Sequence, residues 1–271
     1  MRRAEPAGMS LPGERPGARP AGLREGPVPW IVPDWPVDRC VRGFATTRAG
    51  GAGTGPYASL NLGAHVGDEP AAVAENRRRL VAALGLPGEP RWLTQVHGSR
   101  VARAESLDHD DVPEADAVVC RTRGIVCAVL TADCLPVLLA DRRGSVVAAV
   151  HGGWRGLAAG VLEAALAAMD RPATELCAWL GPAISGAVYE VGGEVRERML
   201  EADDDTAACF APARPGHYLL DLRGVARVKL RRAGVPAVHG GLWCTLGMPR
   251  WFFSYRRDGR CGRMATGIHL A

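Results

Sequence analysis

The stretch that decides the fold runs from residue 125 to residue 156 and reads IVCAVLTADCLPVLLADRRGSVVAAVHGGWRG. Two apolar runs, at 125–131 and 136–140, are followed by a polar turn at 142–144 and a third apolar run at 145–151. Short apolar runs bounded by turn residues are typical of buried strands. The last two runs therefore predict a β-hairpin. Apolar residues at helical spacing then predict a helix over 157–169.

The rest of the chain from residue 30 continues this alternation of strands and helices. A helix is expected at 70–84, ending at Gly85 and Pro87, with two more at 192–202 and 223–233. Further strands are expected at 42–47, 91–97, 116–120, 176–180, 217–221, 236–239, 251–255 and 263–270. Strands with helices outside them predict an α/β (α+β) fold. We expect residues 30–271 to form a single layered domain of mixed β-sheets with outer helices.

The first 29 residues have a different composition. They hold six prolines and five glycines, and no apolar periodicity. Such a segment buries too little apolar surface to offset the entropy lost on ordering. The sequence predicts a disordered N-terminal extension over residues 1–29.

Composition excludes several classes of protein. No apolar run approaches the roughly 18 residues that a membrane helix needs, so no membrane association is expected. The net charge is only +4, and no basic cluster alternates with aromatic residues as in a nucleic-acid-binding face. The eight cysteines form no C-x-x-C pair and no compact disulfide spacing, which favours a cytoplasmic location. The expected partners are small molecules.

Three residues stand where a predicted strand breaks into a turn: His97, Cys134 and His151. Two imidazoles and a thiolate suffice to hold a catalytic zinc that keeps its fourth position open. The same residues could instead supply a Cys134 nucleophile with His151 as its base. Both interpretations predict an enzyme.

Two charged residues lie beside these candidates. Asp133 interrupts an apolar run, where a charge is costly unless it is paired, so it is expected to support the metal or its histidine, or to act as a general acid or base. Arg155 follows His151 at the start of a helix, where backbone N–H groups and the guanidinium favour an anion. The alternative for this second motif is an ordinary glycine-bearing turn with a hydrogen-bonded histidine.

Polar residues in two further loops are candidate ligand-binding groups. Arg48 and Asn61 belong to a polar set near the N-terminus, and Arg256 follows an aromatic run near the C-terminus. Arginine recognises anionic groups through paired hydrogen bonds. A solvated strand end is the alternative for Arg256.

Taken together, these segments resemble the YfiH family of laccase-domain proteins, whose members are variously called polyphenol oxidases, peptidoglycan editing factors and purine nucleoside phosphorylases. The resemblance runs in the family's order from about residue 30 to the end. The matching stretches are TTR (46–48), SLNLG (59–63), QVHG (95–98), TADCLP (131–136), HGGWRG (151–156), GPAI (181–184), YEV (189–191) and FSYRRD (253–258). Gly152 replaces an alanine usual in the family, Ala183 a common cysteine and Cys261 a threonine; none of these is a presumed metal ligand.

The resemblance implies a zinc site of His97, Cys134 and His151. It also implies phosphorolysis of adenosine and inosine to base and ribose 1-phosphate, with guanosine and methylthioadenosine as further candidate substrates and adenosine deamination as a side activity. We therefore assign catalysis to Cys134, Asp133 and His151, and substrate or phosphate binding to Arg48, Asn61, Arg155 and Arg256.

Three alternatives stay open. One is a Cys134/His151 hydrolase or amidase acting on a peptidoglycan precursor. Another is a copper polyphenol oxidase, which ranks lower because the seven histidines form none of the His-x-His pairs that a multicopper centre needs. The third is a non-catalytic scaffold.

Overall fold

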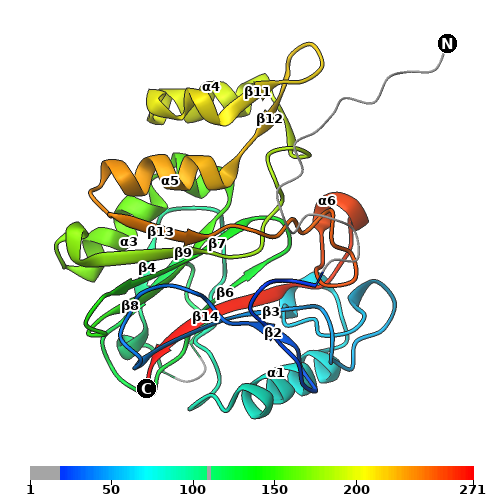
Figure 1. Cartoon of the computed structure of the whole chain (residues 1–271). Helices are drawn as coiled ribbons and strands as arrows, with labels where there is room; N and C mark the ends of the chain where they lie inside the picture. Colours follow the sequence, from blue (N-terminus) through cyan, green and yellow to red (C-terminus); the bar gives the residue numbers. More distant parts are fainter. Residues whose placement is uncertain (1–18, 109–110) are drawn as a thin grey trace.

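Two β-sheets packed face to face form the centre of the molecule, and helices cover the outer face of each (Figure 1). The structure is a computed structural model that describes residues 19–108 and 111–271. From one side to the other, the layers are helices, a six-stranded sheet, a five-stranded sheet and a helix. This is the mixed α/β architecture with outer helices that the sequence predicts.

The six-stranded sheet contains the predicted hairpin. Its strands, in spatial order, are β13 (Ala237–Gly240), β9 (Leu176–Leu180), β7 (Leu135–Asp141), β8 (Val147–Gly152), β5 (Ala117–Cys120) and β4 (Val101–Arg103). The β7–β8 pair is antiparallel and places Val137 opposite Val150. The two outermost pairs, β13 with β9 and β4 with β5, are parallel, so the sheet is mixed.

The five-stranded sheet joins the two ends of the chain. Its spatial order is β1 (Leu23–Arg24), β2 (Trp30–Ile31), β3 (Val41–Thr46), β14 (Met264–Leu270) and β6 (Cys127–Thr131), all antiparallel. The C-terminal strand β14 therefore lies between β3 and β6. Because β6 leads directly into β7, the residues between them connect the two sheets.

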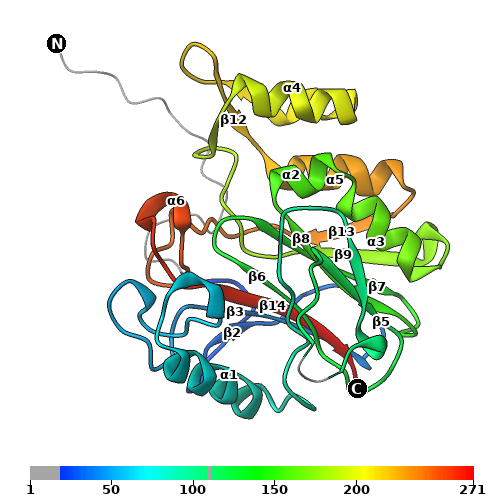
Figure 2. The same ribbon diagram turned by 180° about the vertical axis from the view of Figure 1, so that it is seen from behind.

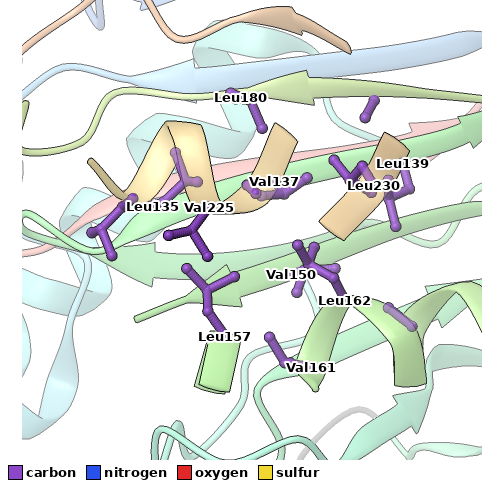
Figure 3. Close-up of a cluster of buried hydrophobic side chains, with 14 of the residues drawn as sticks. Leu135, Val137, Leu139, Val150, Leu157, Val161, Leu162, Leu180, Val225 and Leu230 are labelled. Atoms are coloured by element: carbon purple, nitrogen blue, oxygen red, sulfur yellow. The ribbon is translucent and has the colours of Figure 1, made fainter. Parts of the chain in front are cut away.

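Alternation along β7 shows why both faces of the six-stranded sheet are buried. Val137 and Leu139 pack toward α2 (Trp154–Ala158), α3 (Val161–Met169) and α5 (Leu222–Arg232), whereas Leu138 and Ala140 pack against the other sheet. Figure 3 shows the helix-side cluster, with side chains from β7, β8 and β9 meeting those of the three helices. Each fully buried aliphatic side chain contributes about 1.5–3 kcal/mol.

The opposite face of the five-stranded sheet is covered by α1 (Pro70–Leu84), which has the bounds that the sequence predicts. Leu80 of this helix packs with Leu62, Phe44 and Leu130 in a separate cluster. Figure 2 shows α1 on the far side of the sheets from α3 and α5.

A small third sheet, in the order β10 (Glu190–Gly192), β12 (His217–Leu220), β11 (Phe210–Pro212), carries α4 (Gly193–Ala202) at the end of the molecule beyond α5. The remaining helix is α6 (Tyr255–Asp258). Short 3-10 helices occur at Gly55–Tyr57, Ala64–Val66, Ala104–Ser106, Ala173–Glu175 and Asp204–Cys209. No helix in the described ranges is long and apolar enough to cross a bilayer.

Three predicted elements are wrong in detail. Residues 91–97 make only isolated bridges at Arg91 and Thr94. The helix expected over 157–169 is broken, because Gly160 adopts φ 85° and separates α2 from α3. Residues 251–255 form no strand, since Ser254 instead caps α6 by accepting a hydrogen bond from the N–H of Arg257.

Residues before the predicted boundary at residue 30 also take part in the fold. β1 pairs with β2, and the Leu23 and Val28 side chains are buried, so these two apolar residues extend the core into the segment predicted to be disordered. Residues 1–18, which make up most of that predicted extension, lie outside the described residues.

Candidate metal centre

The three candidate ligands meet where the two sheets join. Cys134 lies in the connection from β6 to β7, and His151 lies on β8 opposite Pro136, so that β-pairing sets the two side by side. His97 comes from the loop before β4. The ligand atoms of the three residues all lie within 4.8 Å of one another.

This spacing fits a tetrahedral metal ion. Cys134 Sγ lies 3.8 Å from His97 Nε2. Typical zinc–sulfur and zinc–nitrogen bonds at a tetrahedral angle would separate the two atoms by about 3.6 Å. The rings of His97 and His151 lie edge to face, with centroids 4.7 Å apart. The donor set and its spacing therefore fit one bound zinc-type ion.

Asp116, which the sequence analysis missed, orders two of the three ligands. Its Oδ1 accepts hydrogen bonds from His151 Nδ1 at 2.8 Å and from the His97 N–H at 2.9 Å. Its Oδ2 accepts from the N–H groups of Val96 (3.2 Å) and Gly98 (2.7 Å). Because Nδ1 of His151 donates to a carboxylate, Nε2 is left free for a metal.

Backbone conformation at His97 follows from the same carboxylate. His97 has φ 60°, which is uncommon for a residue other than glycine. The turn directs three successive N–H groups at Asp116, and such concave N–H arrays hold anions. The hydrogen bonds thus maintain a conformation that would otherwise be disfavoured.

Gly153 makes room for the ligands. A Cβ at this position would lie 2.7 Å from His97 Cδ2 and 3.3 Å from Cys134 Sγ. Only a residue without a side chain fits here without displacing the His97 ring.

The electrostatics favour a thiolate. Burial acts to raise the pKa of Cys134, but the adjacent His151 and His97 outweigh it and lower the pKa to about 6. Burial acts to lower the pKa of His151, whereas Cys134 and Asp116 raise it to about 9. Without a metal ion, both shifts come from the attraction between a thiolate and an adjacent imidazolium, and a bound metal would take the place of the Nε2 proton.

One side of the ligand cluster faces an open cavity of about 420 Å³. Besides the three ligands, its walls include Tyr189, Tyr255, Arg256, Arg263, His65 and Gln95. Aromatic faces and two guanidinium groups around a metal site suit a ligand that is both planar and anionic.

The structure brings one of the four predicted ligand-binding residues into this cavity. Arg256 lines it, with Nη1 donating to the Glu190 carbonyl and the guanidinium 4.9 Å from the Tyr189 ring centroid. Arg155 lies over the Trp154 ring and lines a neighbouring hollow of about 330 Å³. Since that hollow also includes Tyr189 and Arg256, the two spaces adjoin.

The other two predicted ligand-binding residues support the loops around the cavity. Arg48 donates through Nε and Nη2 to the Ala58 carbonyl and through Nη1 to the Pro249 carbonyl. The Asn61 side chain is buried and accepts a hydrogen bond from the N–H of Arg263 at 2.8 Å. Neither lines the cavity.

Asp133 also lines the cavity, but its carboxylate contacts Thr245, Ser254 and the N–H of Arg256 rather than the metal ligands. Asp116, and not Asp133, is the carboxylate that supports the histidines. The signal that singled out Asp133 applies equally to Asp116, an acidic residue at the start of a buried apolar strand.

Comparison with known proteins places this centre in a family. The model of the family described as multi-copper polyphenol oxidoreductase laccase matches residues 42–271. The chain is 49% identical over 242 residues to a purine nucleoside phosphorylase of Pseudomonas aeruginosa, covering 89% of this chain and 98% of the relative. It is 48% identical over 240 residues to the purine nucleoside phosphorylase YfiH of Escherichia coli K12, covering 89% and 98%.

Solved structures share the whole fold. Protein NMB0706 of Neisseria meningitidis superposes with a TM-score of 0.85 at 48% identity, covering 89% of this chain and 98% of the other. YlmD of Geobacillus stearothermophilus superposes with a TM-score of 0.79 at 30% identity, covering 93% and 99%.

Proposed function

The chain belongs to the YfiH family of laccase-domain proteins, and from this premise we propose that it is a zinc-dependent purine nucleoside phosphorylase. The observation that carries the proposal is the convergence of His97, Cys134 and His151 on a cavity whose wall also holds Arg256. Relatives at 48% and 49% identity bear that enzyme name. Because two candidate ligands come from loops at the junction of the two sheets and His151 comes from β8, we propose one catalytic domain that comprises the predicted residues 30–271 together with the preceding strand β1.

The proposed reaction transfers a ribosyl group to inorganic phosphate. An oxygen of hydrogen phosphate forms a bond to C1′ of the nucleoside as the bond from C1′ to the base nitrogen breaks, and the proton that the phosphate loses balances the proton that the departing base gains. The products are the free purine and ribose 1-phosphate. Adenosine and inosine are the expected substrates.

Different residues of the cavity have different roles in this proposed reaction. A zinc ion held by His97, Cys134 and His151 would supply a Lewis acid beside the reacting groups. Arg256 binds the phosphate through the guanidinium N–H groups that Glu190 does not use, and Arg155 adds positive charge from the adjoining hollow. Tyr189 and Tyr255 provide aromatic faces for the base or ribose. The site excludes bulk water on the side where His151 is buried.

The first experiment measures turnover and metal together. Purified protein incubated with inosine or adenosine should release base only when phosphate is present, and ribose 1-phosphate should appear in equal amount. The protein should hold close to one zinc per chain, and Cys134→Ala, His97→Ala and His151→Ala should each lose it. Equal base release without phosphate would make the enzyme a hydrolase and overturn the proposal.

We also propose adenosine deamination as a side activity of the same centre, because a metal-activated water is the usual requirement for that reaction. Ammonia release from adenosine in the absence of phosphate measures it. No ammonia from the zinc-loaded enzyme would remove this part of the proposal and leave phosphorolysis unaffected.

A second candidate has a specific observation in its favour. The lowered pKa of Cys134 beside His151 is the feature of a cysteine nucleophile paired with a histidine base. A hydrolase or amidase of this kind would need Cys134 and His151 but not His97. Full activity of a zinc-free His97→Ala variant would favour it.

A copper polyphenol oxidase has less support. Across residues 19–108 and 111–271, His97, Cys134 and His151 form the one group of three or more potential ligands, which is enough for a single ion. A multicopper centre needs several such groups.

A further inference from the structure

Asp133 holds a buried carboxylate directly before the metal ligand Cys134. Its Oδ1 accepts a hydrogen bond from Thr245 Oγ1 at 2.5 Å. Its Oδ2 accepts from Ser254 Oγ at 3.0 Å and from the N–H of Arg256 at 2.7 Å. Asp133 also has φ 96°, a value that a residue other than glycine keeps only where its surroundings hold it.

The three donors come from one distant segment of the chain. They lie 112, 121 and 123 residues after Asp133, in the stretch that carries α6 and two of the side chains lining the cavity, Tyr255 and Arg256. Ser254 also accepts from the N–H of Arg257 and so begins α6. A single carboxylate therefore attaches the cationic wall of the cavity to the loop that carries Cys134.

The backbone of Asp133 extends the same connection. Its carbonyl accepts a hydrogen bond from the N–H of Ile184 at 3.0 Å, and Ile184 also lines the cavity. The neighbouring Ala183 accepts from the N–H of Thr245 at 3.1 Å. Two loops of the cavity thus converge on Asp133.

This arrangement is unsuited to proton transfer. A general acid or base must reach the substrate with a free oxygen or proton. Each Asp133 oxygen accepts at least one hydrogen bond from a fixed protein donor, and within the described ranges no hydrogen bond joins its carboxylate to His97, Cys134 or His151.

We propose that Asp133 is a positioning residue, and not the general acid or base expected from the sequence. It holds Arg256 and Tyr255 at the correct distance from the metal ligands, so it acts on substrate binding. The proposal rests on the proposed function in one respect: it takes the anion at Arg256 to be the phosphate co-substrate.

The test compares variants that remove one hydrogen bond at a time. Asp133→Asn replaces an acceptor oxygen by a donor, Thr245→Val removes one donor at nearly constant volume, and Thr245→Ser keeps that donor as the matched control. Asp133→Asn should retain about one zinc per chain, raise KM for phosphate about tenfold or more, and change kcat less. The tenfold figure corresponds to one lost hydrogen bond to a charged group. Thr245→Val should change KM in the same direction by a smaller factor, and Thr245→Ser should resemble the parent.

A second readout does not depend on turnover. Amide hydrogen exchange in residues 252–258 should become faster in Asp133→Asn and Thr245→Val, while exchange in residues 96–98 stays unchanged, because Asp116 holds that loop independently. If Asp133→Asn fails to fold, the comparison of Thr245→Val with Thr245→Ser decides the question.

The outcomes separate this proposal from the proposed function. A fall in kcat of a hundredfold or more at unchanged KM and unchanged exchange would assign proton transfer to Asp133 and overturn the inference. If the parent enzyme shows no phosphorolysis, calorimetric titration with inorganic phosphate still tests whether Asp133 is a positioning residue. Weaker phosphate binding together with faster exchange in the variants would support Asp133 as a positioning residue, and unchanged values of both would reject it.

Discussion

Asp116 accepts a hydrogen bond from Nδ1 of His151 at 2.8 Å, and the same carboxylate accepts the N–H of His97 at 2.9 Å. Burial acts to raise the pKa of Asp116, but the hydrogen bonds from His151 and Gly98 outweigh it and keep the pKa below its usual value. One buried anion thus orients the ring of one metal ligand and the backbone of another. A metal site assembled from two loops and the strand β8 depends on such a connection to keep its geometry.

We expect Asp116→Asn to weaken zinc binding about 10- to 100-fold, the usual effect of removing a carboxylate that supports a histidine ligand. Competition with a chromogenic chelator measures this affinity. Asp141→Asn is the matched control, because Asp141 is also a buried carboxylate that accepts backbone N–H groups, from Ser145 and Val146, but lies away from the ligands. Equal zinc affinity in the two variants would contradict the role of Asp116.

Gly153→Ala should displace the ring of His97. The added Cβ would lie 2.7 Å from His97 Cδ2, closer than any ordinary contact, so either the ring or the loop must move. We expect less than one zinc per chain after dialysis against a weak chelator, with the folded state retained. Gly98→Ala should retain its zinc, because its Cβ would meet only ordinary contacts at 3.6 Å and 3.7 Å. The idea fails if Gly153→Ala binds zinc as tightly as the parent.

The arginines of the site should separate into supporting and binding residues. Arg48→Ala removes hydrogen bonds to two backbone carbonyls and the contact over the Phe253 ring, so it should lower the free energy of unfolding by about 1–3 kcal/mol. Arg256→Ala should instead raise KM for phosphate, with a smaller effect on the melting temperature. Thermal melts and initial rates of both variants check this. A raised KM for phosphate in Arg48→Ala together with a loss of stability in Arg256→Ala would contradict both assignments.

The three residues that converge in the candidate metal centre could be singled out from the sequence because each stands where an apolar run breaks into a turn. Asp116 carries a similar signal but is the first residue of the predicted strand 116–120, where an acidic residue is typical of an ordinary strand end. The loop at 91–97 resembles a strand in sequence, yet the side chain of Gln95, not a neighbouring strand, pairs with the backbone of Leu130, accepting its N–H and donating to its carbonyl. When a side chain takes the place of a neighbouring strand in pairing with the backbone, the sequence shows no alternation of apolar and polar residues that would reveal it.

The roles of Arg48 and Asn61 show a second limit on what could be predicted from the sequence. Both belong to polar motifs that resemble those of the family. The residue type alone does not distinguish a polar side chain that binds a ligand from one that hydrogen-bonds to the protein backbone. The Asn61 side-chain amide donates hydrogen bonds to Gly63 and Asp68 and accepts one from the N–H of Arg263, so its polar atoms are used within the protein. The break at Gly160 was visible as a glycine within a helical pattern, but only its φ of 85° makes it a helix end.

The reactivity of Cys134 should depend on metal and on pH. With zinc bound, the thiolate is coordinated, so alkylation by iodoacetamide should be slow. After chelation, His151 and His97 lower the pKa of Cys134 to about 6, so the reactive thiolate predominates above pH 6 and the rate should fall as the pH drops through that value. Cys209 provides an internal comparison, because burial, with Asp221 and Asp203 nearby, raises its pKa to about 11 and keeps it protonated at neutral pH.

Mass spectrometry of peptides labelled over a range of pH measures both rates in one sample. Chelation should abolish phosphorolysis, and added zinc should restore it before alkylation of Cys134 but not after. A cysteine nucleophile predicts another pattern: activity that survives chelation and alkylation that destroys it whether or not zinc is present. Because His97 approaches Cys134 Sγ at 3.8 Å and a nucleophile paired with His151 would have no use for it, we expect the first pattern.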